Sequence, residues 1–137
     1  GPPSAGALLA VRIANIEAIA EEFGRDTVER AIVVAASHLR RAITDLDLVA
    51  RVGHHQFALL LDGPIAAEAA LSKAQQLVAS GLRQAEALPA ALTLKFHVAV
   101  ALLPHETLDA QACLDWALEE LAQMPPDARK LIRPLNF

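Results

Sequence analysis

Hydrophobic residues occupy every second position between residues 92 and 102, the most regular alternation in the chain. The apolar face of this stretch consists of Leu92, Leu94, Phe96, Val98, Val100 and Leu102. Because successive side chains of a β-strand point to opposite faces, the pattern predicts one long strand, which Pro104 ends. A shorter apolar stretch at 8–13 predicts a second buried strand, with one face formed by Leu9, Val11 and Ile13.

Two helices are predicted between residues 15 and 43. Residues 15–23 form a short helix before Gly24, a residue type that often ends helices. Asp26 precedes Glu29 by three positions, which is the spacing of a capping box and predicts the start of a second helix there. Apolar residues then follow at steps of three or four and form one helix face: Val28, Ile32, Ala35, Leu39 and Ile43.

A β-hairpin is predicted in the middle of the chain, from short apolar strands at 46–52 and 56–61 joined by a turn that begins at Gly53. The Asp62-Gly63-Pro64 segment predicts the end of this hairpin and the first turn of a helix that runs to about residue 87. A last helix is predicted over 108–123, followed by a closing edge strand at 130–134.

The predicted order is therefore β-α-α-β-β-α-β-α-β, which indicates an α/β protein, or α+β in strict usage. It is the ferredoxin-like split βαβ plan with an extra early helix and a late extension, and it implies about five mostly antiparallel strands. We expect one domain over residues 4–137. Residues 1–3 are typical of a tag scar or linker, so we expect the domain to have been excised from a longer signalling protein.

Composition excludes several classes of protein. Hydrophobic residues make up 54% of the 137 residues and charged residues 20%, which excludes a disordered chain. A net charge of −4, with no Tyr and 4% aromatic residues, argues against binding nucleic acid or an anionic membrane. A single cysteine, Cys113, excludes an intrachain disulfide and fits a reducing compartment such as the cytoplasm.

Four segments in register resemble the GGDEF domains, the diguanylate cyclases. Residues 47–61 read Asp-Leu-Val-Ala-Arg-Val-Gly-His-His-Gln-Phe-Ala-Leu-Leu-Leu, against a family line of roughly D-L-V-A-R-L-G-G-D-E-F-A-L-L-L. Residues 14–24, 97–104 and 115–118 are similar to three further family motifs at matching spacing. The resemblance covers nearly the whole chain, and it implies a nucleotide-cyclase-like fold with the signature turn at Gly53, His54, His55, Gln56 and Phe57.

The family joins two GTP molecules into cyclic di-GMP, with one GTP on each half-site of a dimer. This chemistry needs divalent metal ions, which carboxylates hold. The resemblance places Arg12, His55 and Gln56 at the acidic positions, and His54 at the second glycine. The family's lysine after the first-helix aromatic matches Glu17. The resemblance therefore implies that the catalytic residues are lost, and that the domain has no metal, no cofactor and no cyclase activity.

The family's inhibitory cyclic di-GMP site, R-x-x-D, matches Thr44 to Asp47. Its aspartate is kept as Asp47, but Thr44 replaces the arginine that would supply a planar fork to the ligand. Arg40 and Arg41 lie one helical turn earlier and could reach the site in part. The resemblance thus argues against tight binding of cyclic di-GMP at this site.

The residues themselves leave alternatives open. The His54-His55 pair is interpreted as a polar turn tip rather than a metal site, because adjacent residues rarely chelate together. His97 is interpreted as a residue packed against a helix or partly exposed, rather than a ligand. Arg12 is either an anion-binding residue in an altered pocket or a structural cation, and we favour a structural cation paired with Glu17 or another acid. Glu29 is favoured as a helix-start carboxylate.

The function expected from the sequence is that of a catalytically inactive GGDEF-like domain. It would regulate, dimerise or dock a partner in cyclic di-GMP signalling, through a surface that includes Ile16, His54 and His55. The partner would be another domain of the same protein, a separate protein, or a second copy in a weak homodimer. The alternative is a non-catalytic sensor of GTP or cyclic di-GMP. We expect no nucleic acid and no membrane contact by this domain, and a location in the cytoplasm.

Overall fold

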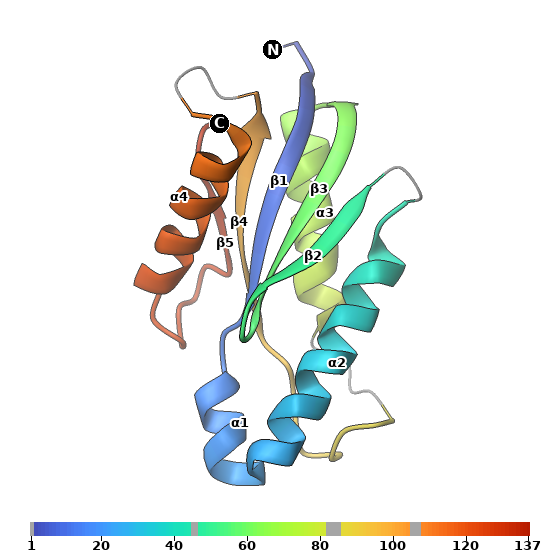
Figure 1. The fold of residues 1–137 in the computed structure, drawn as a ribbon, viewed down its shortest axis with the longest axis vertical. Helices are drawn as coiled ribbons and strands as arrows, with labels where there is room; N and C mark the ends of the chain where they lie inside the picture. The colour runs from blue at the N-terminus through green and yellow to red at the C-terminus, as the bar shows by residue number, and fades with distance from the viewer. Residues whose placement is uncertain (1, 45–46, 82–85, 105–107) are drawn as a thin grey trace.

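A computed structural model describes residues 2–44, 47–81, 86–104 and 108–137 of the chain. It is a five-stranded sheet with helices on both faces (Figure 1). The elements, in order, are β1 (Ser4–Ile13), α1 (Ile16–Phe23), α2 (Arg25–Ala42), β2 (Leu48–Gly53), β3 (Gln56–Ile65), α3 (Ala67–Gly81), β4 (Phe96–Leu103), α4 (Ala110–Gln123) and β5 (Ile132–Pro134). The predicted order of elements and the mixed α+β class are confirmed.

The strands lie in the order β2-β3-β1-β4-β5. β1 is the central strand and pairs antiparallel with β3 on one side and β4 on the other. β2 pairs antiparallel with β3, and β5 runs parallel to β4 at the opposite edge. The predicted mostly antiparallel sheet, including its short closing strand, is therefore confirmed.

Both faces of the sheet are apolar, but helices cover them unequally. The larger core lies against α2 and α3 and contains the predicted alternate positions of β1 and β4, such as Leu9 and Val98. Ala10 and Ala99 belong to the other face, where they contact Leu121 of α4. Figure 1 shows α4 over the β4 side of this face and α3 behind the opposite face. The α4 face is thus covered over only part of its width.

Several predicted boundaries are wrong, three of them for a local reason. α2 begins directly after Gly24, whose φ of 90° is a backbone conformation that glycine adopts readily. No side chain caps the start of this helix, so the predicted capping box at Asp26 does not form. β3 continues to Ile65 instead of ending at Leu61, so Pro64 lies in this strand and α3 begins at Ala67. The register of β3 against β1 shifts here, and a Cβ atom at Gly63 would collide with the carbonyl group of Ala5.

The third boundary concerns β4, which begins at Phe96 rather than at residue 92. Leu92 and Leu94 are nevertheless buried in the main core. The alternation of apolar residues therefore predicted their burial correctly, but it wrongly predicted that they belong to a paired strand. α3 is described to Gly81, and the predicted helix then enters residues outside the described part of the chain. Residues 86 and 87 form a turn, so the predicted helix end at about residue 87 is wrong.

The last helix is held at its start by a side chain that the sequence interpretation passed over. The Asp109 carboxylate accepts a hydrogen bond of 2.7 Å from the backbone N–H of Ala112, which satisfies a free amide at the N-terminus of α4. Cys113 of this helix is buried in a cluster with Leu8 and Ala101 of the sheet, as expected. None of the helices in the described part of the chain is long and apolar enough to span a membrane.

Candidate functional site

Arg12, Gln56 and His97 lie side by side across three neighbouring strands. Arg12 in β1 is paired in register with Gln56 of β3 and with His97 of β4. Residues directly opposite each other in paired strands have Cβ atoms about 4.5–5.5 Å apart. Arg12, near the end of β1, and Gln56, the last polar residue of the signature turn, therefore lie side by side on the face that α4 covers.

Arg12 joins the sheet to the end of α4. Its Nη2 donates a hydrogen bond of 2.6 Å to the backbone carbonyl of Met124, the residue that ends α4. Nη2 and Nε lie 3.0 and 3.3 Å from Nδ1 of His97. We call this set, formed by Arg12, His97 and the Met124 carbonyl, the Arg12 clamp. Its partners are neutral acceptors, so the expected pairing with Glu17 or another acid is wrong; no salt bridge involves Arg12 among the described residues.

His97 is fully buried and neutral in this arrangement. Burial of the imidazole, together with the positive charges of Arg12 and Lys95, lowers the pKa of His97 to about 4. Because Nδ1 accepts from Arg12, the ring proton must reside on Nε2, which is buried without a hydrogen-bond partner. This burial agrees with the expectation of a packed side chain and contradicts that of a partly exposed one. Burial also lowers the pKa of the Arg12 guanidinium.

The signature turn is braced by its own backbone and by Arg51. The Arg51 guanidinium donates to the carbonyls of Gly53 and His54, at 3.0 and 2.7 Å. The His55 carbonyl accepts from the Ile13 N–H at 3.0 Å, which ties the turn to the end of β1. The His54 and His55 rings meet edge to face with centroids 5.7 Å apart. Neither belongs to a group of three or more possible metal ligands among the described residues.

A cavity of about 430 Å³ lies between the first helix and the signature turn. Basic and acidic groups mix along its wall: Arg12, His55, Lys95, Glu17, Glu21 and Asp127. Burial lowers the pKa of His55; the charges of His54 and Arg12 act in the same direction, and Glu17 opposes them. His55 is therefore neutral near pH 7, and its Nδ1 is buried without a partner.

A second cavity, of about 570 Å³, lies on the other side of the turn between α1 and α2. Ala20, Arg25, Val28, Glu29 and His54 line it. The Glu29 carboxylate lies 3.6 Å from Nε2 of His54, and both side chains are 58% exposed. A polar contact so open to water contributes little to stability. Glu29 thus contacts the turn rather than capping the start of α2.

The Asp47 carboxylate accepts hydrogen bonds from two backbone amides. One carboxylate oxygen accepts from the Asp62 N–H at 2.9 Å, and the other accepts from the Thr44 N–H at 3.2 Å. Burial raises the pKa of Asp47, but these hydrogen bonds and the charge of Lys73 outweigh it, so the pKa is lowered. The side chain that the resemblance assigns to an inhibitory ligand site thus connects β2, β3 and the end of α2.

Ile16 is not a surface residue. It is only 8% exposed and packs in the main core at the start of α1, so its predicted part in an interaction surface is wrong. The neighbouring Asn15 fixes this start, because its amide group donates to the Thr93 carbonyl at 2.7 Å and accepts from the Lys95 N–H at 3.0 Å. A helix positioned by side-chain hydrogen bonds turns Ile16 inward.

The residues present do not fit a magnesium ion. Mg²⁺ takes oxygen ligands, and carboxylates supply the charge in protein sites. The described residues contain no group of three or more histidine, cysteine, aspartate or glutamate side chains that could hold a metal. At the strand end, a guanidinium and a neutral amide occupy the positions where the family resemblance would put carboxylates.

Sequence reasoning missed the contact between Arg12 and Met124. The contribution of Met124 is a backbone carbonyl, which carries no residue-type signal, and the segment after Gln123 was interpreted only as a helix end. The pairing of His97 with Arg12 was also missed, because the strand predicted over 92–102 put His97 in its middle, whereas β4 begins at Phe96.

The chain belongs to the GGDEF family. The family model described as "Diguanylate cyclase, GGDEF domain" matches residues 2–130. No curated protein matches the chain.

Solved structures show the same fold. The GGDEF domain of YfiN (or TpbB) from Pseudomonas aeruginosa has a TM-score of 0.82 at 25% identity, over 96% of this chain and 83% of that one. An EAL/GGDEF domain protein from M. capsulatus has a TM-score of 0.80 at 21% identity, over 100% of this chain and 87% of that one. The active GGEEF domain of a diguanylate cyclase from Vibrio cholerae has a TM-score of 0.73 at 18% identity, over 96% and 83%.

Proposed function

We propose that this GGDEF domain is catalytically inactive and serves cyclic di-GMP signalling as a regulatory, dimerising or partner-docking module. The observation that carries the proposal is the Arg12 clamp. A guanidinium stands at the end of β1, and its donors are engaged by His97 and Met124, so it is part of the fold rather than a free side chain.

The chemistry of the cyclase argues in the same direction. Linking two nucleoside triphosphates requires metal ions that neutralise phosphate charge and activate a hydroxyl group. A fixed positive charge repels a divalent cation by roughly 8 kcal/mol at 4 Å with an effective dielectric constant of 20. His55 and Gln56 offer no anionic oxygen to offset that repulsion.

The alternative function is a sensor that binds GTP or cyclic di-GMP without turnover. The two cavities beside the signature turn favour it, because together they could admit a nucleotide. Against it stand the mixed charges of the first cavity and the engagement of Asp47 by two backbone amides. We therefore favour a domain that acts through a surface, within a longer signalling protein in the cytoplasm.

Calorimetric titration with GTP, cyclic di-GMP and Mg²⁺ tests this proposal, with the active Vibrio cholerae domain as the positive control. We expect no heat of binding at protein concentrations that detect dissociation constants up to about 1 mM. Binding of either nucleotide without turnover would establish the sensor instead.

A restored signature makes the test sharper. The variant His54→Gly, His55→Asp, Gln56→Glu should remain inactive, because Arg12 still repels the metal. Activity in that triple variant would show that Arg12 is not the obstacle and would contradict the main argument.

A further inference from the structure

β5 is the last strand of the sheet on the side away from β2, and its outer edge is unpaired among the described residues (Figure 1). On its inner edge, the Val98 N–H of β4 donates to the Leu131 carbonyl at 2.9 Å. Successive residues of a strand turn their backbone groups to opposite sides. The N–H and C=O groups of Ile132 therefore point away from β4, where a further strand can pair with them.

A groove of about 480 Å³ lies beside this edge, between β5 and α3. The helix and the strand each contribute three residues to it: Gln75, Val78 and Ala79, and Lys130, Leu131 and Ile132. Val78 and Ile132 are half-buried and pack against the main core. Because Lys130 and Ile132 lie two positions apart, their side chains share the face towards α3. An added strand, about 4.8 Å from β5, would place its own side chains over this groove.

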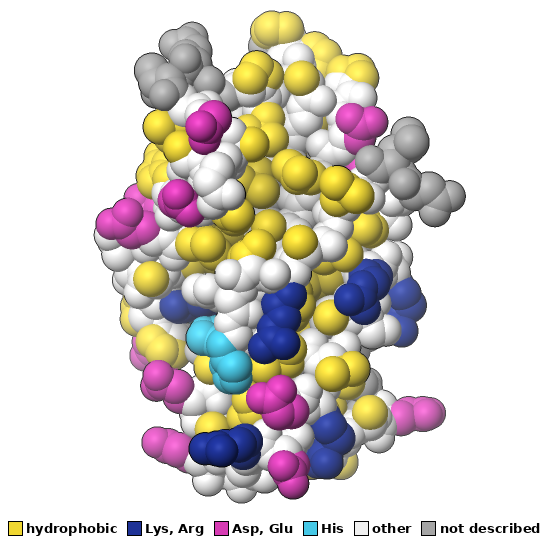
Figure 2. Space-filling view, in the orientation of Figure 1, with side chains coloured by type: hydrophobic (Ala, Val, Ile, Leu, Met, Phe, Trp, Pro, Cys, Tyr) yellow, Lys and Arg dark blue, Asp and Glu magenta, His cyan; other side chains and the backbone are white. Residues whose placement is uncertain are grey.

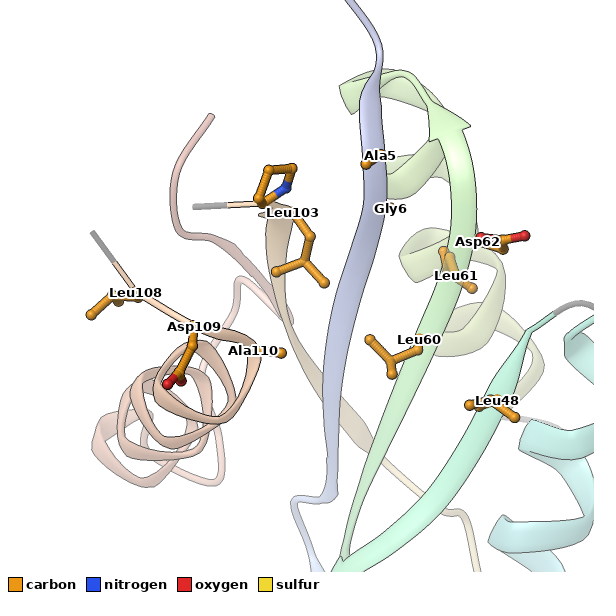
Figure 3. Close-up of a pocket in the computed structure, with 11 residues that line it drawn as sticks. Ala5, Gly6, Leu48, Leu60, Leu61, Asp62, Leu103, Leu108, Asp109 and Ala110 are labelled. Atoms are coloured by element: carbon orange, nitrogen blue, oxygen red, sulfur yellow. The ribbon is translucent and has the colours of Figure 1, made fainter. Parts of the chain in front are cut away.

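The open edge distinguishes this groove from the other apolar hollow of the domain. Hydrophobic side chains also gather on the opposite face, beside α4 (Figure 2). Figure 3 shows the hollow there, with Leu60 of β3 on its floor. β3 is paired with β1 on one side and with β2 on the other, so a further strand cannot pair with it. At β5, in contrast, unpaired backbone groups and an apolar groove lie side by side.

Lys130 indicates the charge of the occupant. It is the one charged residue that lines the groove, and its ammonium group has no hydrogen bond or ion pair within the described part of the chain. Arg133 belongs to the other face, where it donates to the Glu120 carboxylate at 2.9 Å. An unpaired ammonium group beside an apolar groove attracts a carboxylate of the occupant.

A second copy of β5 complements this edge poorly. In an antiparallel pair of two copies centred on Ile132, Pro134 of each copy would lie opposite Lys130 of the other. Proline has no N–H to donate, and no carboxylate would meet either lysine. A strand with an acidic residue and without proline satisfies both the backbone and the charge.

We propose that the β5 edge binds an extended segment of a partner protein, which adds to the sheet as an antiparallel strand. In this direction one apolar residue of the segment exchanges both backbone hydrogen bonds with Ile132. A glutamate or aspartate two positions later then meets Lys130. The proposal rests on the proposed docking role and names the kind of segment that docks. It can fail on its own, because its readout is peptide binding, whereas the readout of inactivity is GTP turnover.

The test titrates an eight-residue peptide into the ¹⁵N-labelled domain. The peptide alternates threonine with valine and carries one glutamate two positions after a valine. Amide signals of β5 and of the groove side of α3 should shift, and the Ile132 amide should exchange with solvent at least tenfold more slowly in the saturated complex. Shifts confined to another surface, or unchanged exchange at Ile132, would overturn the proposal.

Two altered peptides separate the backbone contacts from the charge contact. N-methylation of the valine opposite Ile132 removes the amide that would donate to the Ile132 carbonyl, and it should weaken binding at least tenfold. Replacing the glutamate with lysine should weaken binding by a similar factor. Undiminished binding of the N-methylated peptide would show that no strand is added, and undiminished binding of the lysine peptide would remove Lys130 from the site; either result overturns the proposal.

Lys130→Glu locates the charge contact. This variant should bind the glutamate peptide at least tenfold more weakly, and it should bind the lysine peptide as tightly as the wild type binds the glutamate peptide. A misfolded variant would not gain the second property. Arg40→Glu is the matched control, because Arg40 of α2 is exposed, changes the net charge equally and does not line the groove. Equal weakening by Arg40→Glu would mean a non-specific effect of charge and would overturn the site.

Sedimentation tests the competing occupant, a second copy of the chain. We expect the wild-type domain to be monomeric at the concentrations of the titration. Self-association that a saturating amount of the glutamate peptide abolishes would assign the β5 edge to a homodimer and overturn the partner strand.

Discussion

Replacing Arg12 with aspartate puts back the residue type that a metal site needs, and we expect the fold to lose stability. The change removes the donors to the Met124 carbonyl and to His97 Nδ1. Hydrogen bonds to charged groups contribute about 1.5–3 kcal/mol each. Arg12 is only half-buried, so water can reach part of the vacated space, and we take the lower value for both partners. The expected loss is about 3 kcal/mol of unfolding free energy at pH 7.5.

The same variant should change how stability depends on pH. In the wild type, the pKa of His97 is about 4 in the folded protein and about 6.5 when unfolded. Below pH 6.5 the unfolded chain therefore binds the proton more readily, and stability falls as the pH decreases towards 4. Between pH 7.5 and pH 5 the expected fall is about 2 kcal/mol from this group. A carboxylate at position 12 would favour the protonated imidazole, so the fall should shrink or reverse.

Urea denaturation at pH 7.5 and pH 5 measures both effects. Arg129→Asp is the matched control, because it reverses the charge of an exposed arginine outside the Arg12 clamp and should cost within about 0.5 kcal/mol. The reasoning is refuted if Arg12→Asp is as stable as this control at pH 7.5. It is also refuted if the unfolding free energy of Arg12→Asp falls between pH 7.5 and pH 5 as much as that of the wild type, since the charge of residue 12 would then not affect the pKa of His97.

Two further perturbations test the hairpin and the core. His54→Ala, at an exposed turn, should change the unfolding free energy by no more than about 0.5 kcal/mol, whereas Val98→Ala, in the fully buried core, should cost about 1–3 kcal/mol by urea denaturation; a costlier histidine change would show that the turn is part of a working site. Asp47→Ala removes the acceptor for two backbone amides and should cost about 1–2 kcal/mol at pH 7. The pKa of Asp47 is lowered in the fold, so the stability that its carboxylate contributes is present above its unfolded pKa and is lost as the pH falls through the folded value. In acid, the difference in unfolding free energy between Asp47→Ala and the wild type should therefore become smaller.

Most of the fold could be predicted from the spacing of apolar residues and the burial that this spacing implies. The apolar faces of 8–13, 26–43 and 92–102 all became core, because apolar side chains must leave water whatever their backbone does. The predicted ends of elements were wrong where backbone geometry, rather than the apolar pattern, sets the boundary. Gly63 suggested a turn, but it lies within β3 because β1 approaches too closely for a side chain. Leu92 and Leu94 kept the alternation of a strand without its pairing.

The candidate site was predictable in its residues but not in its contacts. The register of three strands brings Arg12, Gln56 and His97 together, although His97 lies in the middle of the strand predicted over 92–102. The partner of Arg12 was not predictable, because the Met124 carbonyl is a backbone group whose position depends on where α4 ends. Ile16 was assigned to the surface because the orientation of α1 is set by Asn15, through contacts distant in the sequence.

The measurement that tests the central claim most directly is cyclic di-GMP production from GTP by the purified domain, with Mg²⁺ and separately with Mn²⁺, over a long incubation. The active Vibrio cholerae domain, under the same conditions, shows that the assay detects turnover. We predict that product stays at the level of the protein-free reaction, because Arg12, His55 and Gln56 provide no carboxylate for the metal. Product that rises in proportion to the concentration of this domain, and that a chelator abolishes, would contradict the account.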